Sequence, residues 1–381
     1  MLDITSQRPT WADINLDNLA ANFHSVKEFV GRNVKYMAVV KADAYGHGAV
    51  QCAKRLEAEG VDWFGVALPE EGFELRRAGI TKLILCLGGF WNEQESLVLN
   101  YHLTPVVFQI EKARLLNAAA ERRGTVASIH VKVDTGMGRV GVRYDQVREF
   151  ADSLSQLEHL RLEGLMTHFA SADDLSQNEF TDLQIQRFHE AVAIFRERGF
   201  KPAYLDLANS PGAVAHPDAR SNMVRLGGVL YGLGGDVLPR GIEKPTLKPV
   251  MSLHTCIADI KHIPAGDSVG YGRTFVAARD SLIATIPIGY QDGYSRPLSN
   301  VGRAIVRGCY APVAGRISMD WTTLDVTDVT DATIGDEVIL IGEQGGLQVL
   351  AEDLAKPTGT ISYEITCGIN RRVPRRYLPE E

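Results

Sequence analysis

Lys41 is the first residue of this chain whose type and position together indicate chemistry. It follows five apolar or aromatic residues, Tyr36 to Val40, and precedes a stretch rich in small residues and glycine. This pattern is typical of a buried parallel strand that feeds a helix, with the lysine at the C-terminal end of the strand. In α/β barrels the catalytic groups lie at that end. A desolvated lysine there can be neutral and act as a nucleophile and a base, although many strand-end lysines are simply solvated charges.

Two glycine-containing turns could hold an anion at the same end of the predicted strands. They comprise residues 209–212 (NSPG) and residues 225–228 (RLGG), and each closes an apolar run. Backbone N–H groups at helix starts and glycine turns suit phosphate, because no side-chain entropy is lost on binding. Barrel enzymes often bind phosphate at this corner of the fold. The sequence therefore offers one candidate amine and two candidate phosphate sites.

The elements that must position these residues alternate regularly between strand and helix. Eight such strands are expected within about 200 residues, each followed by a helical or mixed segment. This pattern predicts a (β/α)8 TIM-type barrel. A doubly wound open sheet is the alternative, but no GxGxxG motif follows the first strand, so a dinucleotide-binding fold has no support. The expected strands cover residues 34–41, 63–68, 82–88, 103–108, 128–134, 160–169, 203–209 and 222–228.

A second, mostly β domain is expected after a linker rich in glycine and proline at residues 232–249. Beyond it the apolar pattern changes to a period of two, with one helical patch near the end. We therefore expect a barrel domain at residues 1–246 and a β-rich domain at residues 247–381. Residues 10–16 read as a short strand, and whether it joins the C-terminal domain stays open. The expected C-terminal strands are 250–263, 282–290, 303–308, 319–326 and 337–341, and the helical patch is 351–354 with 358–367.

The composition limits the class of protein. The chain of 381 residues has 40 basic and 47 acidic side chains, a net charge of −7, which disfavours a nucleic-acid partner. Its five cysteines are scattered without metal-ligand or redox spacing and indicate free thiols in a reducing compartment. No apolar run approaches the roughly 18 residues of a membrane span. We expect a cytoplasmic protein without a bound metal.

The sequence around Lys41, AVVKADAYGHG, resembles the cofactor-lysine motif of alanine racemases. These fold-type III enzymes use pyridoxal 5'-phosphate (PLP). Matching stretches recur from Trp11 to Arg376, nearly the whole chain. The resemblance implies an isomerase that interconverts L-alanine and D-alanine by a two-base mechanism and supplies D-alanine for cell-wall peptidoglycan.

The resemblance also assigns residues to the cofactor. Lys41 would hold the aldehyde of PLP, and Arg225 would face its pyridine nitrogen. An arginine cannot give a proton to that nitrogen, so the ring stays a shallow electron sink, which suits racemisation better than transamination. The residues implied to contact PLP are Lys41, Tyr45, His168, Asn209, Ser210, Arg225, Gly228, Val229 and Tyr363.

Racemisation removes a proton from one face of Cα and returns one to the other face, so two bases are the simplest design. By resemblance Lys41 serves one face and Tyr271 the other. A phenol has an ordinary pKa near 10, so the phenolate of Tyr271 needs stabilisation. The family links it to a histidine and to the pyridine arginine, here His168 and Arg225.

The substrate is small and carries a carboxylate, for which Arg139 and the backbone of Met319 look like holders. Tyr290 resembles a residue that narrows the entrance and would limit the substrate side chain to about a methyl group. Lys132, on the strand before Arg139, is carbamylated in some relatives, and the resulting anion pairs with the arginine. Whether Lys132 is modified in this chain stays open.

Lys41 and Tyr271 belong to different predicted domains, and in the family they belong to different chains. The resemblance therefore implies a head-to-tail homodimer with two shared sites. A PLP-dependent amino-acid decarboxylase is an alternative, but it should carry an acidic residue in place of Arg225. A non-catalytic PLP carrier would lack the β domain. A serine or broad-specificity amino-acid racemase stays open, since one hydroxyl changes pocket selectivity only modestly.

Overall fold

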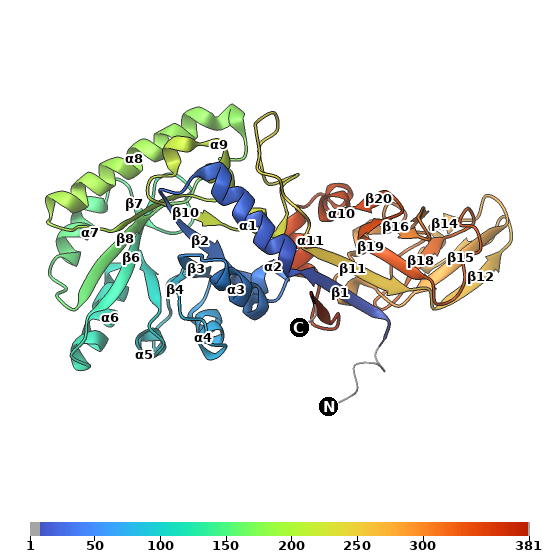
Figure 1. The fold of residues 1–381 in the computed structure, drawn as a ribbon, viewed down its shortest axis with the longest axis horizontal. Helices are drawn as coiled ribbons and strands as arrows, with labels where there is room; N and C mark the ends of the chain where they lie inside the picture. The colour runs from blue at the N-terminus through green and yellow to red at the C-terminus, as the bar shows by residue number, and fades with distance from the viewer. Residues whose placement is uncertain (1–7, 380–381) are drawn as a thin grey trace.

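Eight parallel strands close into a barrel in the computed structural model, which describes residues 8–379 (Figure 1). Neighbouring strands pair in sequence order around the barrel, β10 pairs with β2, and the pairing of Val106 with His130 joins β5 to β6. The predicted (β/α)8 barrel is therefore confirmed. Its strands are β2 (Lys35–Val39), β3 (Trp63–Val66), β4 (Leu83–Cys86), β5 (Thr104–Val107), β6 (Ala127–Asp134), β8 (Leu160–Met166), β9 (Tyr204–Ala208) and β10 (Met223–Leu226), and the short β7 (Val142–Arg143) extends β6.

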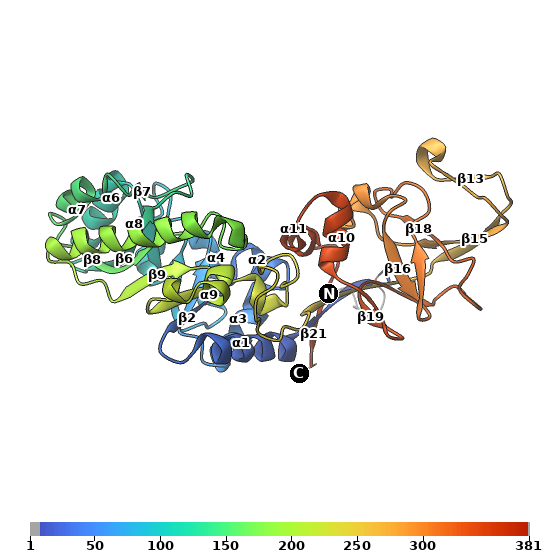
Figure 2. The same ribbon diagram turned by 90° about the horizontal axis from the view of Figure 1, so that it is seen from above.

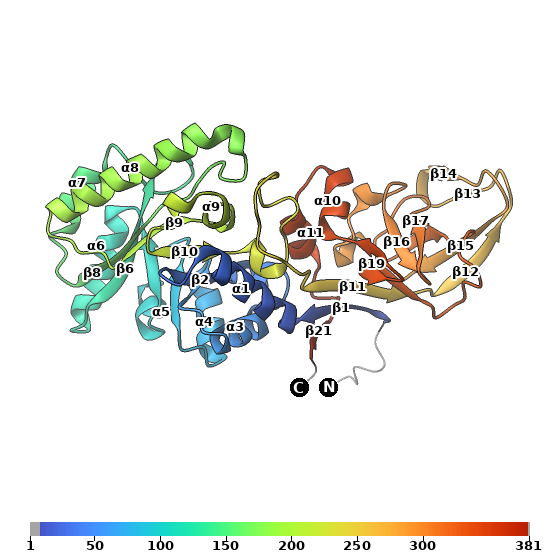
Figure 3. The same cartoon turned by 45° about the horizontal axis from the view of Figure 1, so that its top comes forward.

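Amphipathic helices surround the barrel (Figures 1 and 3). In the first helix, Leu19, Phe23, Val26 and Val30 recur every three or four residues, and all four side chains are buried. Asn15 caps this helix, because its Oδ1 accepts a hydrogen bond of 2.8 Å from the N–H of Asn18. The helices are α1 (Leu16–Val30), α3 (Ala49–Ala58), α4 (Pro69–Arg77), α5 (Glu95–Asn100), α6 (Ile110–Arg122), α7 (Val147–Leu154), α8 (Asn178–Glu197) and α9 (Ser210–Ala215).

Alternate residues of each strand fill the barrel interior in layers. The lowest layer is aromatic, with the ring of Trp63 5.2 Å from His130 and 5.2 Å from Tyr204. Above it lies an apolar layer that includes Met37, Leu85, Val106, Met166 and Met223. Lys132 and Asp206 lie two residues after His130 and Tyr204 of the aromatic layer and both pair in register with Met166, and Arg225 lies two residues after Met223. All three charged side chains are buried, and the aromatic layer lies below them.

The C-terminal region consists mostly of strands and lies beside the barrel, which gives an elongated molecule (Figures 2 and 3). Its largest sheet has seven strands in the order β17-β16-β19-β11-β1-β21, with β20 on β19. The N-terminal strand β1 lies in this sheet, antiparallel to β11 and parallel to β21. The bounds are β1 (Thr10–Asn15), β11 (Met251–Cys256), β16 (Arg303–Val306), β17 (Cys309–Pro312), β19 (Glu337–Gln344), β20 (Leu347–Val349) and β21 (Arg375–Leu378).

Two smaller sheets and two helices complete this region. Strands β12 (Asp259–Ile263), β15 (Ser281–Ile286) and β18 (Thr322–Asp325) form one sheet, and β13 (Ser268–Val269) and β14 (Phe275–Val276) form a hairpin. Helices α10 (Ala351–Thr358) and α11 (Ser362–Gly368) follow. A second domain built mostly of strands is therefore confirmed. Within residues 8–379 we find no helix long and apolar enough to cross a membrane.

Some predicted element bounds were wrong. The single strand expected at residues 250–263 is two strands in different sheets. The chain changes sheets at Ile257 and Ala258, whose N–H groups bond to the carbonyls of Asp336 and Thr285. The expected single helical patch is the pair α10 and α11. The short strands β13, β14, β20 and β21 were not predicted, because two to four residues are too few to show a period.

Candidate active site

A cavity of about 660 Å³ opens at the C-terminal ends of the barrel strands. It brings together residues that the sequence had singled out from β2, β6, β9 and β10, from the loops that follow them, and from helix α11. Among its charged side chains the cationic ones outnumber the carboxylates, which are Asp173 and Asp236. The predicted residues that line it are Lys41, Tyr45, Lys132, Arg139, His168, Asn209, Ser210, Arg225 and Tyr363.

Lys41 begins a turn with an unusual backbone. Strand β2 ends at Val39, and Ala42, Asp43, Ala44 and Tyr45 all have left-handed φ angles between 53° and 55°. Such a conformation is strained for residues with a Cβ, so other groups must hold it. The N–H of Ala42 donates to a carboxylate oxygen of Glu71 at 2.8 Å. The turn therefore gives Lys41 a defined position at the rim of the cavity.

Both lysines of the cavity lie in surroundings that disfavour the charged amine. Burial lowers the pKa of Lys41, and Arg139 and Arg225 lower it further. Burial, followed by the same two arginines, lowers the pKa of Lys132 to about 8. Lys132 is 5% exposed and makes no ion pair with any described residue. Each amine therefore exists partly in its neutral, nucleophilic form closer to physiological pH than an ordinary lysine.

Arg225 is the best-anchored charged side chain of the site. Its Nη1 forms a buried ion pair with Oδ1 of Asp206. Its Nη2 donates to the carbonyl of Thr167 at 2.9 Å and to Nδ1 of His168 at 3.2 Å. We find no partner for Nε within residues 8–379. The guanidinium is therefore fixed at both ends, and Nε remains available to donate to a bound molecule.

His168 is neutral in this network. Burial, then Arg225, lowers its pKa to about 2. Because the guanidinium can only donate, Nδ1 accepts and the ring proton lies on Nε2. The predicted strand 160–169 was too long, since β8 ends at Met166 and His168 follows it in the loop. This places the imidazole at the cavity wall, where it can donate from Nε2.

A narrow cradle of glycine backbone and tyrosine hydroxyls lies at the ends of β9 and β10. A Cβ on Gly228 would come within 2.4 Å of the Tyr363 hydroxyl, and one on Gly227 within 2.7 Å of the Tyr45 hydroxyl. Only glycine therefore admits both hydroxyls. Burial raises the pKa of both tyrosines, so each stays protonated and able to donate.

Ser210 completes this cradle. Its Oγ accepts a hydrogen bond of 2.9 Å from the N–H of Gly227, which leaves its own proton free to donate. The N–H groups of Gly228 and Val229 have no backbone partner among the described residues. Asn209 uses its Oδ1 to cap α9 through the N–H of Gly212 at 3.0 Å. Several donors therefore converge on one spot, as an anionic group requires.

Three predicted residues, Tyr271, Tyr290 and Met319, lie instead on the C-terminal domain, and none of these three, which we call the C-terminal cluster, lines the cavity. Tyr271 is 71% exposed, Met319 50% and Tyr290 40%. Backbone hydrogen bonds join Tyr290 to Ser318 at 3.0 Å and Gln291 to Met319 at 3.1 Å. Tyr271 lies between β13 and β14, and all three overall views place this hairpin at the end of the domain remote from the barrel.

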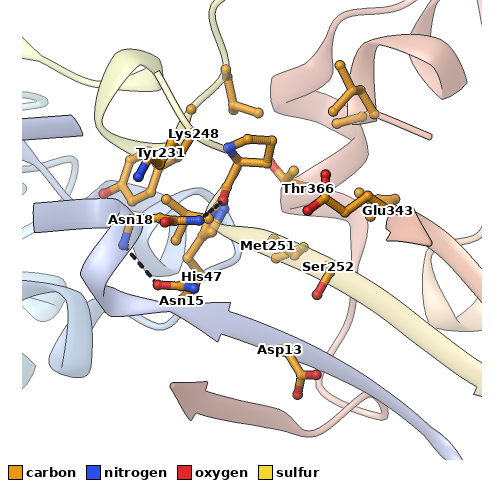
Figure 4. Close-up of a pocket in the computed structure, with 18 of the residues that line it drawn as sticks. Asp13, Asn15, Asn18, His47, Tyr231, Lys248, Met251, Ser252, Glu343 and Thr366 are labelled. Carbon is orange, nitrogen blue, oxygen red and sulfur yellow. Dashed lines mark hydrogen bonds between the residues drawn. The ribbon is translucent and has the colours of Figure 1, made fainter. Parts of the chain in front are cut away.

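A second cavity, of about 580 Å³, lies between the barrel and the C-terminal domain (Figure 4). It is lined by Asp13, His47, Tyr231, Ser252 and Glu343, among others. Figure 4 shows the cap bond from the N–H of Asn18 to Asn15 and the bond from Nδ2 of Asn18 to the carbonyl of Pro249 at 2.8 Å, which joins helix α1 to the segment before β11. None of the predicted site residues lines it. We therefore treat the cavity at the barrel mouth as the candidate active site.

Sequence reasoning missed two acidic residues of the site. Asp206 forms the ion pair with Arg225, and Glu71 holds the turn after Lys41. An aspartate between leucines in the segment YLDLA was a usable signal, because a charge in an apolar strand must have a partner. Glu71 gave no such signal, since an acidic residue in the first turn of a helix is common.

Comparison with known proteins identifies one family for both the barrel and the C-terminal domain. The family model described as "Alanine racemase, N-terminal domain" matches residues 14–234, and "Alanine racemase, C-terminal domain" matches residues 250–377. An alanine racemase from Geobacter sulfurreducens is 46% identical over 376 residues, which cover 97% of each chain.

Solved structures of alanine racemases have the same overall fold. An alanine racemase from Clostridium difficile 630 superposes with a TM-score of 0.91 at 40% identity, covering 98% of this chain and 96% of that one. An alanine racemase from Bartonella henselae, described with covalently bound pyridoxal phosphate, has a TM-score of 0.88 at 29% identity and covers 98% of this chain and 100% of its own.

Proposed function

Because the chain belongs to the alanine racemase family, whose members are PLP-dependent isomerases, we propose that its barrel cavity holds PLP and interconverts L-alanine and D-alanine. We further propose that this activity takes place in the cytoplasm and supplies D-alanine for peptidoglycan. The single observation that carries the proposal is the cavity itself. One space holds an amine with a lowered pKa, a cradle of anion donors and an arginine with one free N–H.

The residues of the cavity fit PLP. The cofactor needs an amine for its aldehyde, donors for its phosphate and a partner for its ring nitrogen. Lys41 would supply the amine, and Nε of Arg225 would donate to the ring nitrogen. Ser210, Gly228, Val229 and the hydroxyls of Tyr45 and Tyr363 would supply the phosphate donors. Asn209 would support them through its cap on α9.

PLP, when bound, withdraws electrons from Cα of an attached amino acid and so makes its Cα–H acidic. Lys41, once released, would move the proton on one face of Cα, because burial and two neighbouring arginines favour its neutral amine. Arg225 would keep the ring nitrogen unprotonated, since a guanidinium has no proton to give at neutral pH. Protonation at Cα would then compete well against transamination.

Tyr271 would serve the opposite face from a second copy of the chain. Within one chain this phenol lies on a remote hairpin and is 71% exposed, and no residue of the 247–360 segment lines the cavity. Tyr290, Met319 and Trp321, which are 40%, 50% and 48% exposed, accompany it on the same domain. Their exposure supports a head-to-tail homodimer in which each C-terminal domain covers the partner's barrel mouth.

The partner's cluster would complete the substrate pocket. Arg139, at the cavity rim, and the backbone of Met319 would hold the substrate carboxylate. Tyr290 and Tyr363 would narrow the space beside Cα to about a methyl group. His168 and Arg225 would stabilise the Tyr271 phenolate, since Nε2 of the neutral imidazole can donate.

Lys132 is proposed to be carbamylated. It is a buried lysine beside Arg139 and Arg225 with a pKa of about 8, so a neutral amine is available to take up CO2 with loss of a proton. The carbamate anion would pair with Arg139 and offset the crowding of positive charge. Intact mass of the native protein and an electron-density map should show the extra group. An unmodified lysine in both would remove this part of the proposal.

A decarboxylase has less support. It would need an acidic residue facing the ring nitrogen, and the buried carboxylate of Asp206 is bonded instead to Nη1 of Arg225. No observation favours a serine or broad-specificity racemase over the alanine enzyme.

The proposed function is tested on the purified protein. We expect a yellow imine absorption that borohydride fixes to Lys41, and loss of optical rotation from L-alanine. Peptide mapping after reduction identifies the modified lysine. A colourless protein that binds no added PLP would falsify the assignment of the cavity.

A further inference from the structure

We infer that Asp206 is a positioning residue of the active site, which fixes Arg225 and sets, by taking up or releasing a proton on Oδ2, the charge that Arg225 presents to the cofactor. The inference deepens the proposed function and rests on it, since it concerns the group that faces the pyridine ring. It adds a pH-dependent element to a residue pair that would otherwise have a constant charge.

The geometry of Asp206 is that of a dedicated partner for one side chain. It lies on β9 two residues after Tyr204 of the aromatic layer, so its side chain enters the barrel interior one level higher. It is 0% exposed. Its Oδ1 accepts the hydrogen bond from Nη1 of Arg225, and its backbone carbonyl accepts a second one at 3.2 Å.

The second carboxylate oxygen has no partner. No donor of the described residues reaches Oδ2 of Asp206, and this atom has no solvent exposure. A buried carboxylate with one paired and one unpaired oxygen can accept a proton on the unpaired oxygen without breaking its bond to Nη1. The pair can therefore change its net charge while its geometry stays the same.

Asp206 lies behind the cavity wall as the buried ion-pair partner of Arg225, whereas the two carboxylates that line the described cavity, Asp173 and Asp236, are exposed. Lys41, Lys132 and Arg139 line the same space as Arg225. With Asp206 ionised, the Asp206–Arg225 pair is neutral overall, and with Asp206 protonated it carries one positive charge. Because Asp206 is 0% and Arg225 3% exposed, water screens this change of charge less than it would at the surface.

The groups that face Asp206 leave it a pH range of its own. Burial raises the pKa of Asp206 to about 6, while Arg225 and Lys132 oppose the rise. On β6, Lys132 has a pKa of about 8 and His130 of about 3. His168, after β8, has a pKa of about 2. Lys41 would be bound to the cofactor in the holoenzyme. Between pH 5 and 7, Asp206 is therefore the interior group that changes charge.

The test compares the absorption spectrum of the PLP-loaded protein from pH 5 to pH 8 in wild type, Asp206→Asn and Asp173→Asn. Asparagine keeps the shape of Asp206 and removes its titration. Asp173 is an exposed carboxylate on the same cavity and serves as the matched control. The phosphate of PLP titrates in the same range, but it does so in all three proteins, so the difference between them isolates Asp206.

We expect a spectral step with a midpoint near pH 6, the pKa of about 6 that burial gives Asp206, in wild type and Asp173→Asn but not in Asp206→Asn. An identical step in Asp206→Asn overturns the inference. A wild-type protein without any cofactor band instead overturns the proposed function, so the two failures are distinguishable.

Two further measurements complete the test. If Asp206→Asn does not fold or bind PLP, infrared difference spectra of wild type decide, because protonation of a buried carboxyl adds a C=O band between pH 7 and pH 5. Absence of that band overturns the inference. If the variant folds, kcat should fall about tenfold with KM for alanine nearly unchanged, since one charge-assisted bond to Arg225 is weakened. A change in KM alone would contradict a role at Arg225.

Discussion

The barrel mouth and the C-terminal cluster differ in how far their predicted functional side chains are buried and bonded within one chain. In the barrel, Arg225 is 3% exposed and bonded to groups from two neighbouring strand ends. In the C-terminal cluster, Tyr271 is 71% exposed on a two-residue-strand hairpin. The first region is finished within one chain, whereas the second presents its functional side chain to solvent.

The difference indicates which predicted groups are prepared when one chain folds and which would need a second chain. Desolvation lowers the pKa of Lys41 and of Lys132 as soon as the barrel closes, so the amine chemistry needs no second chain. The Tyr271 side chain, by contrast, is 71% exposed on the C-terminal domain and does not line the cavity. Cofactor binding should therefore need only one chain, whose barrel and helix α11 line the cavity, whereas the proposed two-base racemisation should need the second chain.

Replacement of Lys41 should cause the largest loss of activity. Lys41→Ala should lose covalent cofactor attachment and at least about 10⁴-fold in racemase activity, because it removes both the holding amine and one base. Mixed with Tyr271→Phe protein under subunit exchange, it should recover about a quarter of wild-type activity, since half the dimers are mixed and each has one intact site. Activity is followed by optical rotation.

The control for this mixing is a double variant, Lys41→Ala with Tyr271→Phe in one chain. Mixed with either single variant it creates no site with both groups intact, so activity should stay at the background. No recovery between the two single variants would contradict the shared site and place both bases in one chain. Recovery in the control mixture would show that the restored activity does not come from a site with both groups intact.

A smaller effect is expected from Tyr271→Phe alone. Racemisation should fall about 10²- to 10⁴-fold, the range for a lost general base. The absorption of bound PLP and the free energy of unfolding of the separated chain should not change, because the hydroxyl of an exposed side chain is removed. Spectra, chemical denaturation and kinetics on one preparation check all three. Loss of the cofactor band would show that Tyr271 belongs to the barrel half.

How much was predictable from the sequence follows the same division. Local repetition revealed the eight barrel strands, and the lysine, the arginine and the glycine turns could be placed at their ends. Pairing between distant segments left no local signal, so the position of β1 between β11 and β21 stayed open. The partner of Arg225 was missed for the same reason, because alternation predicts that Asp206 faces inward but not what it meets.

The smallest expected effect is on the pH dependence of the free energy of unfolding, which the histidines of the barrel should influence. His47 and His130 are buried and His168 is partly buried at the cavity wall, and burial lowers their pKa values to about 4, 3 and 2. Each histidine binds a proton more readily when the chain is unfolded, so its contribution to stability is fully present above pH 6.5 and is lost as pH falls towards these values.

His130 suits the test, because both its ring nitrogens lack partners in the described chain. His130→Leu should reduce the loss of unfolding free energy between pH 8 and pH 5 by about 2 kcal/mol. Urea denaturation at both pH values measures it, with the exposed His262→Gln as the control that leaves the pH dependence unchanged. A pH dependence equal in His130→Leu and wild type would show that the barrel interior does not control acid unfolding.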